Sequence, residues 1–272
     1  MIVARDVPAL RAALATLPRP LALVPTMGAL HDGHLALLRA GQRQAASTVT
    51  SIFVNPLQFA ANEDFDRYPR DDAADLARLQ AAGCNVAWLP SVEAMYRPNR
   101  ATAIEVGGPS EGFEGAARPG HFRGMATVVA KLLHQSSPDL VMFGEKDCQQ
   151  LQVVRRMVAD LDWPVEVVAV PTLRDPDGLA MSSRNRYLTP AQRTVAPGLY
   201  RVLLETAAAD ASPAALAVGD THLRALGMTP DYLALVDADT MRPTTAPSGP
   251  ARLVAAVRLG TVRLLDNVGV PP

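Results

Sequence analysis

Short apolar runs alternate with stretches of helical periodicity along the first 170 residues, and this alternation constrains the fold more than any other feature. Apolar runs with few charged residues are typical of parallel strands that are buried on both faces. Strands that alternate with helices form parallel sheets with helices on both sides. We therefore expect an α/β fold with strands at residues 21–24, 47–54, 86–89, 140–143 and 165–170.

Helix signals lie before and between these expected strands. Asp6 precedes Pro8, which is a helix start signal, and apolar residues then recur at helical spacing as far as Leu17. The glycine-bearing segment 26–34 leads from the first expected strand into another helical pattern. Further helices are expected at residues 73–82, 127–135 and 149–161.

A domain boundary is expected near residue 172, because the sequence changes character after Pro171. We predict a parallel-sheet domain over residues 1–172 and a smaller C-terminal α+β domain over residues 173–272. The signals of the second domain are, in order, a polar loop at 174–186, a capping-box pattern at 189–192, an alanine-rich helix to about 209, and an antiparallel hairpin of strands 252–259 and 262–268.

The composition argues against several classes of protein. The 272 residues include 26 Lys and Arg and 27 Asp and Glu, so the chain lacks the basic excess that is typical of nucleic-acid binders. Two cysteines are too few for a disulfide framework, which fits a reducing compartment. No apolar stretch approaches the roughly 20 residues of a membrane span, and charges interrupt the N-terminal one. We expect a cytoplasmic protein with no nucleic-acid or membrane partner.

Two histidines mark the turn after the first expected strand. His31 and His34 are three residues apart, so they share a face of the helix that begins here, and Gly33 leaves room for a ligand. Helix N-termini at the carboxyl ends of parallel strands bind phosphate groups. For a lone histidine, the more common case is a surface histidine or a residue that hydrogen-bonds within the helix turn. A zinc pair is a further alternative, but the other three histidines are not at metal-ligand spacing, so we expect no protein-bound metal.

Three further polar segments carry possible ligand-binding groups. Residues 143–150 place a lysine and an aspartate after an expected strand, residues 181–185 place two hydroxyls and a guanidinium on a loop, and residues 55–59 place two amides at a turn. Taken alone, these segments are more typical of a solvated helix cap, an ordinary polar loop and a turn, respectively, than of a binding site. Their co-occurrence with His31 and His34 favours a nucleotide site, and the sequence has no P-loop pattern for γ-phosphoryl transfer.

These features together resemble the nucleotidyltransferase relatives of class I aminoacyl-tRNA synthetases, which carry an HxGH motif and a KMSKS-like loop. Longer segments resemble one family of that superfamily, the pantothenate synthetases (pantoate:beta-alanine ligases, AMP-forming). The segments follow one another over nearly the whole chain: PTMGALHDGH at 25–34, SIFVNPLQF at 51–59, RPGHFRG at 118–124, FGEKDCQQ at 143–150, GLAMSSRNRY at 178–187 and RLLDNV at 263–268.

The resemblance implies a function. It implies an ATP-dependent condensation of (R)-pantoate with beta-alanine, through a pantoyl-adenylate, that yields pantothenate, AMP and diphosphate. It also implies a Rossmann-like N-terminal domain, Mg²⁺ bound with the nucleotide, and a cytoplasmic homodimer. Two alternatives remain open: a related nucleotidyltransferase that adenylates a phosphate and needs no amine, and a catalytically idle nucleotide-binding protein.

The resemblance also assigns roles to individual positions. His34 is the expected acid or charge stabiliser, and His31, Lys146 and Arg184 complete the expected catalytic set. The expected ATP-binding residues are Met27, Gly28, Ala29, Leu30, His31, Asp32, Gly33, His34, Gly144, Glu145, Lys146, Asp147, Leu173, Met181, Ser182, Ser183 and Arg184.

The substrate residues and two departures complete the expected site. Asn55, Gln58 and Gln150 are expected to hold pantoate, and Gln58 is expected near beta-alanine as well. Cys148 stands where relatives commonly carry an aromatic residue, and it implies either looser packing or a modifiable thiol. Leu173, expected to hold the adenine through its backbone, stands where valine is frequent.

The polar segment 60–72, directly after Gln58, is a candidate lid. An adenylate has to be kept from water until the amine arrives, and a closing loop excludes water. An ordinary exposed loop is equally compatible with this sequence.

Overall fold

The computed structural model describes residues 1–60 and 63–270, and the chain folds into two compact units. We call them the large unit, Met1–Glu145 with Val153–Val170, and the small unit, Lys146–Gln152 with the described residues from Pro171 onward. The chain therefore passes between the units at more than one point. The functional division at residues 172 and 173 stays a prediction.

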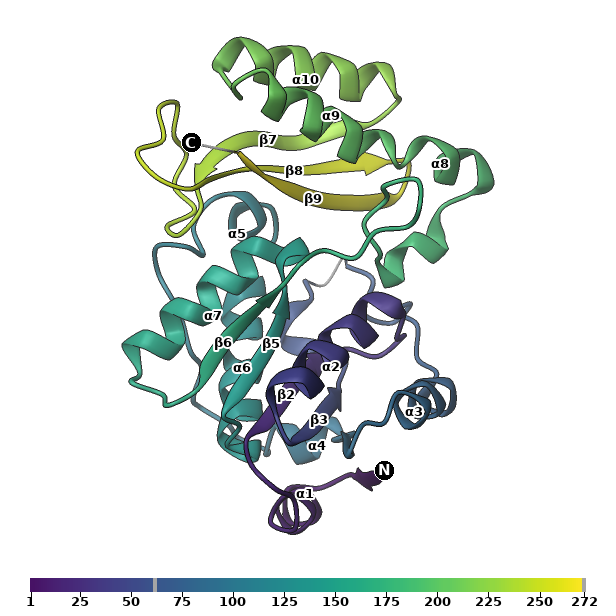
Figure 1. The fold of residues 1–272 in the computed structure, drawn as a ribbon, viewed down its shortest axis with the longest axis vertical. Helices are drawn as coiled ribbons and strands as arrows, with labels where there is room; N and C mark the ends of the chain where they lie inside the picture. Colours follow the sequence, from purple (N-terminus) through teal and green to yellow (C-terminus); the bar gives the residue numbers. More distant parts are fainter. Residues whose placement is uncertain (61–62, 271–272) are drawn as a thin grey trace. The chain divides into compact units, whose positions relative to one another are not determined.

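A six-stranded parallel sheet forms the centre of the large unit (Figure 1), and the expected α/β fold is confirmed. Within the described residues, the strand order is β1-β4-β3-β2-β5-β6. The edge strand β1 is not predicted from sequence, because a run this short shows no periodicity. The strands are β1 (Ile2–Ala4), β2 (Leu21–Thr26), β3 (Ser47–Ile52), β4 (Val86–Trp88), β5 (Leu140–Gly144) and β6 (Glu166–Val170).

The central strand β2 lies between β3 and β5 and is two residues longer than predicted. It continues through Pro25 to Thr26. Proline lacks a backbone N–H, but β5 pairs with β2 only at Ala22 and Leu23, so Pro25 interrupts no ladder on that side. From β2, the strands β3 and β4 follow on one side and β5 and β6 on the other. The point where the direction of the strand order reverses is called the switch point, and ligands of such sheets bind there, beyond the carboxyl ends of the strands.

Helices cover both faces of the sheet. On one face, Ala22 and Val24 of β2 pack in an apolar cluster with Leu38 of α2, and on the other face Leu21 and Leu23 are equally buried. The helices of the large unit are α1 (Val7–Leu14), α2 (Asp32–Gln44), η1 (Pro56–Gln58), α3 (Asp72–Ala81), α4 (Val92–Met95), α5 (Phe113–Ala117) and α6 (His121–Ser136).

Two helix boundaries differ from the predictions by more than one residue. Helix α6 begins at His121 rather than at residue 127, because Gly120 opens it with a φ of +84° and Arg123 interrupts the apolar pattern of its first turns. Helix α1 ends at Leu14, three residues before the predicted end at Leu17. Among the described residues, no helix combines the length and the apolar character that crossing a bilayer requires.

The small unit contains a three-stranded antiparallel sheet of order β7-β8-β9 (Figure 1), and the predicted hairpin is its β8 and β9. Helices α9 and α10 pack against each other and against this sheet. The predicted alanine-rich helix is two helices, separated at Ala196 and Pro197. The elements are η2 (Glu145–Asp147) and α7 (Cys148–Asp160), both shared with the large unit, then η3 (Ser183–Tyr187), α8 (Pro190–Val195), α9 (Gly198–Ala208), α10 (Pro213–Ala225), β7 (Thr229–Asp237), β8 (Ala251–Leu259) and β9 (Val262–Val270).

Candidate active site

Three of the predicted polar segments begin at the carboxyl ends of adjacent strands. The segment Met27 to His34 follows β2, Asn55 and Gln58 follow β3, and Gly144 ends β5. Because the strands are parallel and neighbouring, their carboxyl ends share one edge of the sheet. The large unit therefore holds the starts of three of the four predicted segments at its switch point.

The two histidines form the start of helix α2. His31 is its N-cap residue, and its Nδ1 accepts the backbone N–H of Gly33 at 3.1 Å, while the Nδ1 of His34 accepts the backbone N–H of His31 at 3.3 Å. The ring centroids are 4.1 Å apart. Because both Nδ1 atoms accept, the neutral rings carry their protons on Nε2. The helix start therefore presents two imidazole N–H donors together with its own partial positive charge.

Asp75 holds the turn that leads into this helix. Its two carboxylate oxygens accept the backbone N–H groups of Ala29 and Leu30 at 2.8 and 2.7 Å, and the residue is 3% exposed. Gly28 has a φ of +80°, and a Cβ there would meet Asp75 Oδ2 at 2.9 Å. Burial raises the pKa of the Asp75 carboxyl. Asp75 is not predicted from sequence as part of the site, because an aspartate within a predicted helix carries no signal of burial.

A network of amides occupies the turn after β3. Asn55 Nδ2 donates to Gln58 Oε1 at 3.1 Å and to the carbonyl of Gly124 at 3.1 Å, and Asn55 Oδ1 accepts from Tyr96 Oη at 2.7 Å. Gln58 Nε2 donates to Met27 Sδ at 2.9 Å, which joins this network to the histidine segment. A Cβ at Gly124 would lie 2.0 Å from the Leu57 carbonyl oxygen, so only glycine fits there.

The segment RPGHFRG supports the backbone of Gln58. His121 Nδ1 donates to the Gln58 carbonyl at 2.9 Å, and Arg118 Nη2 donates to the same oxygen at 3.3 Å. Arg118 also forms a bidentate pair with Glu63 at 2.8 and 2.7 Å and donates to His121 Nε2. Burial and the nearby Arg118 charge lower the pKa of His121 to about 4, so the ring is neutral near pH 7. The segment contributes to the family resemblance, but its residues had no predicted role in the site.

The remaining predicted site residues lie in the small unit. Lys146 follows the end of β5, and its Nζ is 3.7 Å from Asp147 Oδ1. The carbonyl of Lys146 accepts from Asn267 Nδ2 at 3.0 Å. Gln150 is partly exposed on α7. The predicted lysine turn is therefore hydrogen-bonded to strand β9 of the same unit.

The Ser-Ser-Arg loop is an ordered turn. Ser182 is the N-cap of η3, and its Oγ accepts the backbone N–H of Arg184 at 3.3 Å. The carbonyl of Leu173 accepts the N–H of Met181 at 3.0 Å, and the Leu173 side chain is exposed. Ser183 is buried. The common binding of one nucleotide by this loop and by the histidines stays a prediction.

Part of the candidate lid packs through aromatic side chains, while several of its described residues are exposed. Residues 61–62 of the predicted segment 60–72 lie outside the described residues. The ring centroid of Phe59 is 5.4 Å from that of Phe65 and 6.0 Å from that of Tyr68, and Tyr68 is buried. Arg70 donates to the carbonyl of Phe65 at 2.8 Å. The role as a lid stays a prediction.

The structure also bears on metal ligands and on the thiol of Cys148. Over residues 1–60 and 63–270, no group of three or more His, Cys, Asp or Glu side chains is arranged to hold a metal ion. Cys148 is buried, and burial raises the pKa of its thiol to about 12. The thiol is therefore protonated and unreactive near pH 7.

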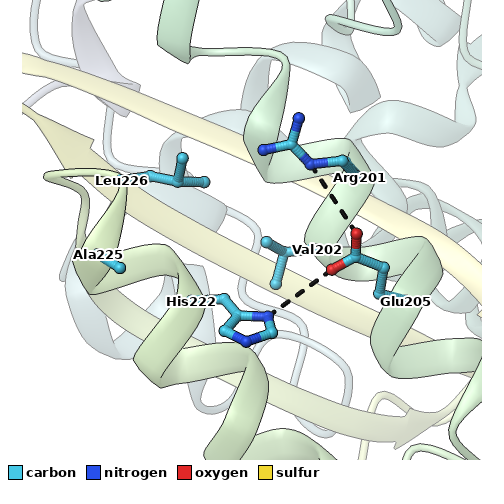
Figure 2. Close-up of a pocket in the computed structure, with 6 residues that line it drawn as sticks. All are labelled: Arg201, Val202, Glu205, His222, Ala225 and Leu226. Atoms are coloured by element: carbon cyan, nitrogen blue, oxygen red, sulfur yellow. Dashed lines mark ion pairs between the residues drawn. The ribbon is translucent and has the colours of Figure 1, made fainter.

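One pocket of the small unit lies apart from all of these residues. Figure 2 shows this pocket, which has a volume of about 290 Å³. Glu205 faces both Arg201, at 3.9 Å, and His222, at 3.7 Å, so the charges in the pocket offset one another. None of its six lining residues was predicted to bind a substrate: Arg201, Val202, Glu205, His222, Ala225 and Leu226.

The parallel sheet, its switch point and the histidine-capped helix define a Rossmann-like α/β enzyme with an HxGH helix start. The particular family follows from sequence comparison. The chain belongs to the pantoate-beta-alanine ligase family, whose sequence model matches residues 2–269. This match confirms the family that the six sequence segments indicate, and the chain is a ligase.

Similar proteins match over nearly their full lengths. A pantothenate synthetase of Acidiphilium cryptum (strain JF-5) is 59% identical and covers 99% of this chain and 100% of that protein, and one of Rhizorhabdus wittichii is 54% identical and covers 100% and 99%. The crystal structure of pantothenate synthetase from Thermus thermophilus has a TM-score of 0.95 at 48% identity over 100% of both chains. A pantoate-beta-alanine ligase from Francisella tularensis, solved with beta-gamma ATP and beta-alanine, has a TM-score of 0.85 at 31% identity and covers 98% of this chain and 97% of that one.

Proposed function

We propose that this chain joins (R)-pantoate to beta-alanine in two steps and consumes ATP. In the first step, the pantoate carboxylate attacks the α-phosphorus of ATP and diphosphate leaves. In the second step, the amine of beta-alanine attacks the pantoyl-adenylate, and pantothenate and AMP are released. Family membership supports this reaction, as does the ATP and beta-alanine complex of the Francisella tularensis ligase.

The observation that carries the proposal is the pair of Nε2 donors at the start of helix α2. The attack brings two anions together and builds charge on the departing diphosphate, so donors have to be in place beforehand. The Nδ1 hydrogen bonds of His31 and His34 hold both rings in place and leave Nε2 as the protonated nitrogen of the neutral ring. We assign His34 as the principal charge stabiliser.

The proposed nucleotide-binding residues include polar segments of the small unit as well as this helix start. Lys146 and Arg184 supply mobile and planar positive charge, and they complete the proposed catalytic set with the two histidines. Leu173 is proposed to hold the adenine through its backbone. The proposed ATP-binding residues are Met27, Gly28, Ala29, Leu30, His31, Asp32, Gly33, His34, Gly144, Glu145, Lys146, Asp147, Leu173, Met181, Ser182, Ser183 and Arg184.

Pantoate is proposed to bind the amides of Asn55, Gln58 and Gln150. An uncharged amide recognises hydroxyl and carboxylate groups without neutralising the nucleophile, which has to keep its negative charge to attack. The hydrogen bond of Gln58 to Met27 supports a pantoate site next to the histidine segment. Beta-alanine is proposed to approach near Gln58.

Four further features belong to the proposal. Mg²⁺ is proposed to bind through the ATP phosphates and water, since this hard cation prefers phosphate oxygens and retains several waters. The chain is proposed to act as a homodimer in the cytoplasm, as the family resemblance implies. Residues 60–72 are proposed as the lid that excludes water from the adenylate. The functional domains are proposed as residues 1–172 and 173–272.

An omission assay tests the proposed function. AMP and diphosphate are measured with ATP, (R)-pantoate and beta-alanine all present, and then with each omitted in turn. We expect AMP only with all three, and diphosphate already with ATP and pantoate. Sustained AMP formation without beta-alanine, or no diphosphate with ATP and pantoate, would contradict the proposal.

A further inference from the structure

We infer that Asp266 and Asn267, neighbours on β9, are positioning residues for the two phosphate-binding segments of the small unit. The inference rests on the proposed function, which places Lys146 and the Ser-Ser-Arg loop on the ATP phosphates. Neither Asp266 nor Asn267 is in the proposed site. Both are 3% exposed, although each side chain is polar.

Successive residues of a strand point to opposite faces of the sheet, so the side chains of Asp266 and Asn267 contact different segments. Asp266 shares a face with Leu264 and Val268, which belong to the apolar core of the small unit. A carboxylate on such a face is costly unless it is paired. Its partner is Arg174, which donates to both carboxylate oxygens, at 2.5 and 2.9 Å.

Arg174 connects Asp266 to the loop that carries Ser182 and Ser183. Its Nη1 donates to the carbonyl of Gly178 at 3.1 Å, and its backbone pairs with Ala180 in an antiparallel bridge. Its Cζ lies 3.5 Å from the ring centroid of Tyr200, which packs against the small unit's core. Residues 181–184 follow directly after this bridge, so the Asp266 pair fixes the base of their loop.

Asn267 fixes the second segment. Its Nδ2 donates to the backbone carbonyl of Lys146 at 3.0 Å, across 121 positions of sequence. The hydrogen bond orients the peptide unit of Lys146 and does not involve the ammonium group. One strand therefore contacts the lysine turn through Asn267 and the base of the serine loop through Asp266 and Arg174.

Kinetics with two variants and a matched control test this inference. Asn267→Ala deletes the bond to Lys146, and Asp266→Asn weakens the pair with Arg174. Asp231→Asn is the control, because Asp231 pairs with Arg258 and Arg263 on the same sheet. We expect the first two variants to raise the KM for ATP about fivefold or more while the KM for pantoate changes less than about twofold. The control should leave both values within about twofold.

A double-mutant cycle separates positioning from a general loss of structure. ATP affinity is measured by calorimetry without pantoate for Asn267→Ala, Lys146→Ala and the double variant. We expect the effect of Asn267→Ala to fall below about twofold once the Lys146 side chain is absent, because it acts through that side chain. An equal effect in both backgrounds would overturn the inference, as would a folded Asn267→Ala enzyme with an unchanged KM for ATP.

The cycle also distinguishes this inference from the proposed function. If Lys146→Ala itself binds ATP as the wild type does, the assignment of Lys146 to the phosphates is wrong and the inference falls with it. If Lys146→Ala weakens ATP binding and Asn267→Ala does not, only the positioning inference is wrong. Should Asp266→Asn fail to fold, Asn267→Ala decides the question alone.

Discussion

His31 and His34 share one hydrogen-bonded helix start, in which each ring nitrogen Nδ1 accepts a backbone N–H of the same turn. The arrangement is a capping box built from imidazoles, where serine and glutamate are usual. In each ring, Nδ1 caps the helix and Nε2 is the proposed donor to the ligand. Variants can therefore separate helix capping from ligand binding.

For His34, we expect the loss of Nε2 to matter more than the loss of the cap. His34→Ala and His34→Asn should lower adenylate formation by about tenfold or more, since asparagine can replace only the Nδ1 acceptor. His34→Gln, which reaches toward the Nε2 position, should retain more activity than His34→Asn. Isotope exchange between diphosphate and ATP in the presence of pantoate measures this step.

Lys146→Ala should show a similar loss in the same exchange assay while its circular dichroism spectrum stays that of the wild type. His222→Ala, on the exposed part of α10, is the control and should exchange at the wild-type rate. Near-normal rates in both His34→Ala and Lys146→Ala would overturn the site assignment.

Gln58→Ala should weaken pantoate binding more than ATP binding, because it removes an amide and leaves the histidine cap in place. We expect a pantoate affinity about tenfold lower, measured by calorimetry. Gln42→Ala is the matched control, since the Gln42 amide binds the Ala82 carbonyl on the surface of the same unit. An unchanged pantoate affinity in Gln58→Ala would remove Gln58 from the site.

Asp75→Asn should lower kcat/KM for ATP by about tenfold, because an amide can accept only one of the two N–H groups that hold the histidine turn. The exposed N-cap variant Asp6→Asn controls for the loss of a carboxylate. If Asp75→Asn retains the wild-type kcat/KM, the turn does not depend on this carboxylate.

The raised pKa of Asp75 predicts how its stability contribution depends on pH. The folded protein binds the proton more tightly than the unfolded chain, whose value is near 3.8. The contribution of Asp75 is therefore full at low pH and is lost as the pH rises through the folded pKa. Urea unfolding should show that the free energy of unfolding of the wild type, relative to Asp75→Asn, falls from pH 4 to pH 7. A difference that rises over this range would contradict the burial argument.

The lowered pKa of His121 predicts the opposite pH dependence of stability. Its pKa is about 4 in the folded protein against 6.5 ordinarily, so the unfolded chain binds more protons between these values. The stability contribution is present above pH 6.5 and is lost as the pH falls toward 4, by on the order of 3 kcal/mol. His121→Asn keeps a donor for the Gln58 carbonyl and does not titrate. Urea unfolding should give the wild type a steeper loss of stability than His121→Asn in this range, and parallel curves would contradict the prediction.

Both cysteines should resist thiol reagents in the native protein. Cys148 and Cys84 are buried, and burial raises the pKa of both thiols. Ellman's reagent should react with neither thiol on the timescale of minutes in buffer and with both in guanidinium chloride. A fast reaction of Cys148 in the folded enzyme would instead identify it as the modifiable thiol considered from the sequence.

Much of the fold could be predicted because its signals are local. The hairpin of β8 and β9 follows from two apolar runs around Gly260 and Thr261, and the strand before His31 follows from one apolar run and a glycine-bearing turn. Strand β7 and helix α10 were not predicted, although Ser212 and Pro213 form a helix start signal and residues 232–236 form an apolar run. Residue type and spacing indicated the two histidines and the three polar segments, and the family resemblance assigned roles to individual residues within them.

The supporting contacts could not be predicted, because they join residues that are distant in sequence. Asp75 reaches back 46 positions to Ala29, and His121 reaches 63 positions to Gln58. In one sequence, a buried aspartate that accepts two N–H groups looks like any helical aspartate. Its role appears only when the turn and the helix are placed in space.

The assignment of Lys146–Gln152 to the small unit has a consequence for protein engineering. No single cut in the polypeptide yields both units intact, because the chain leaves the large unit after Glu145, returns at Val153 and leaves again after Val170. A chimera made by exchanging everything beyond Val170 would join a foreign β9 to the native lysine turn. Such a chimera should function only when the foreign β9 has an asparagine that can donate to the backbone carbonyl of Lys146.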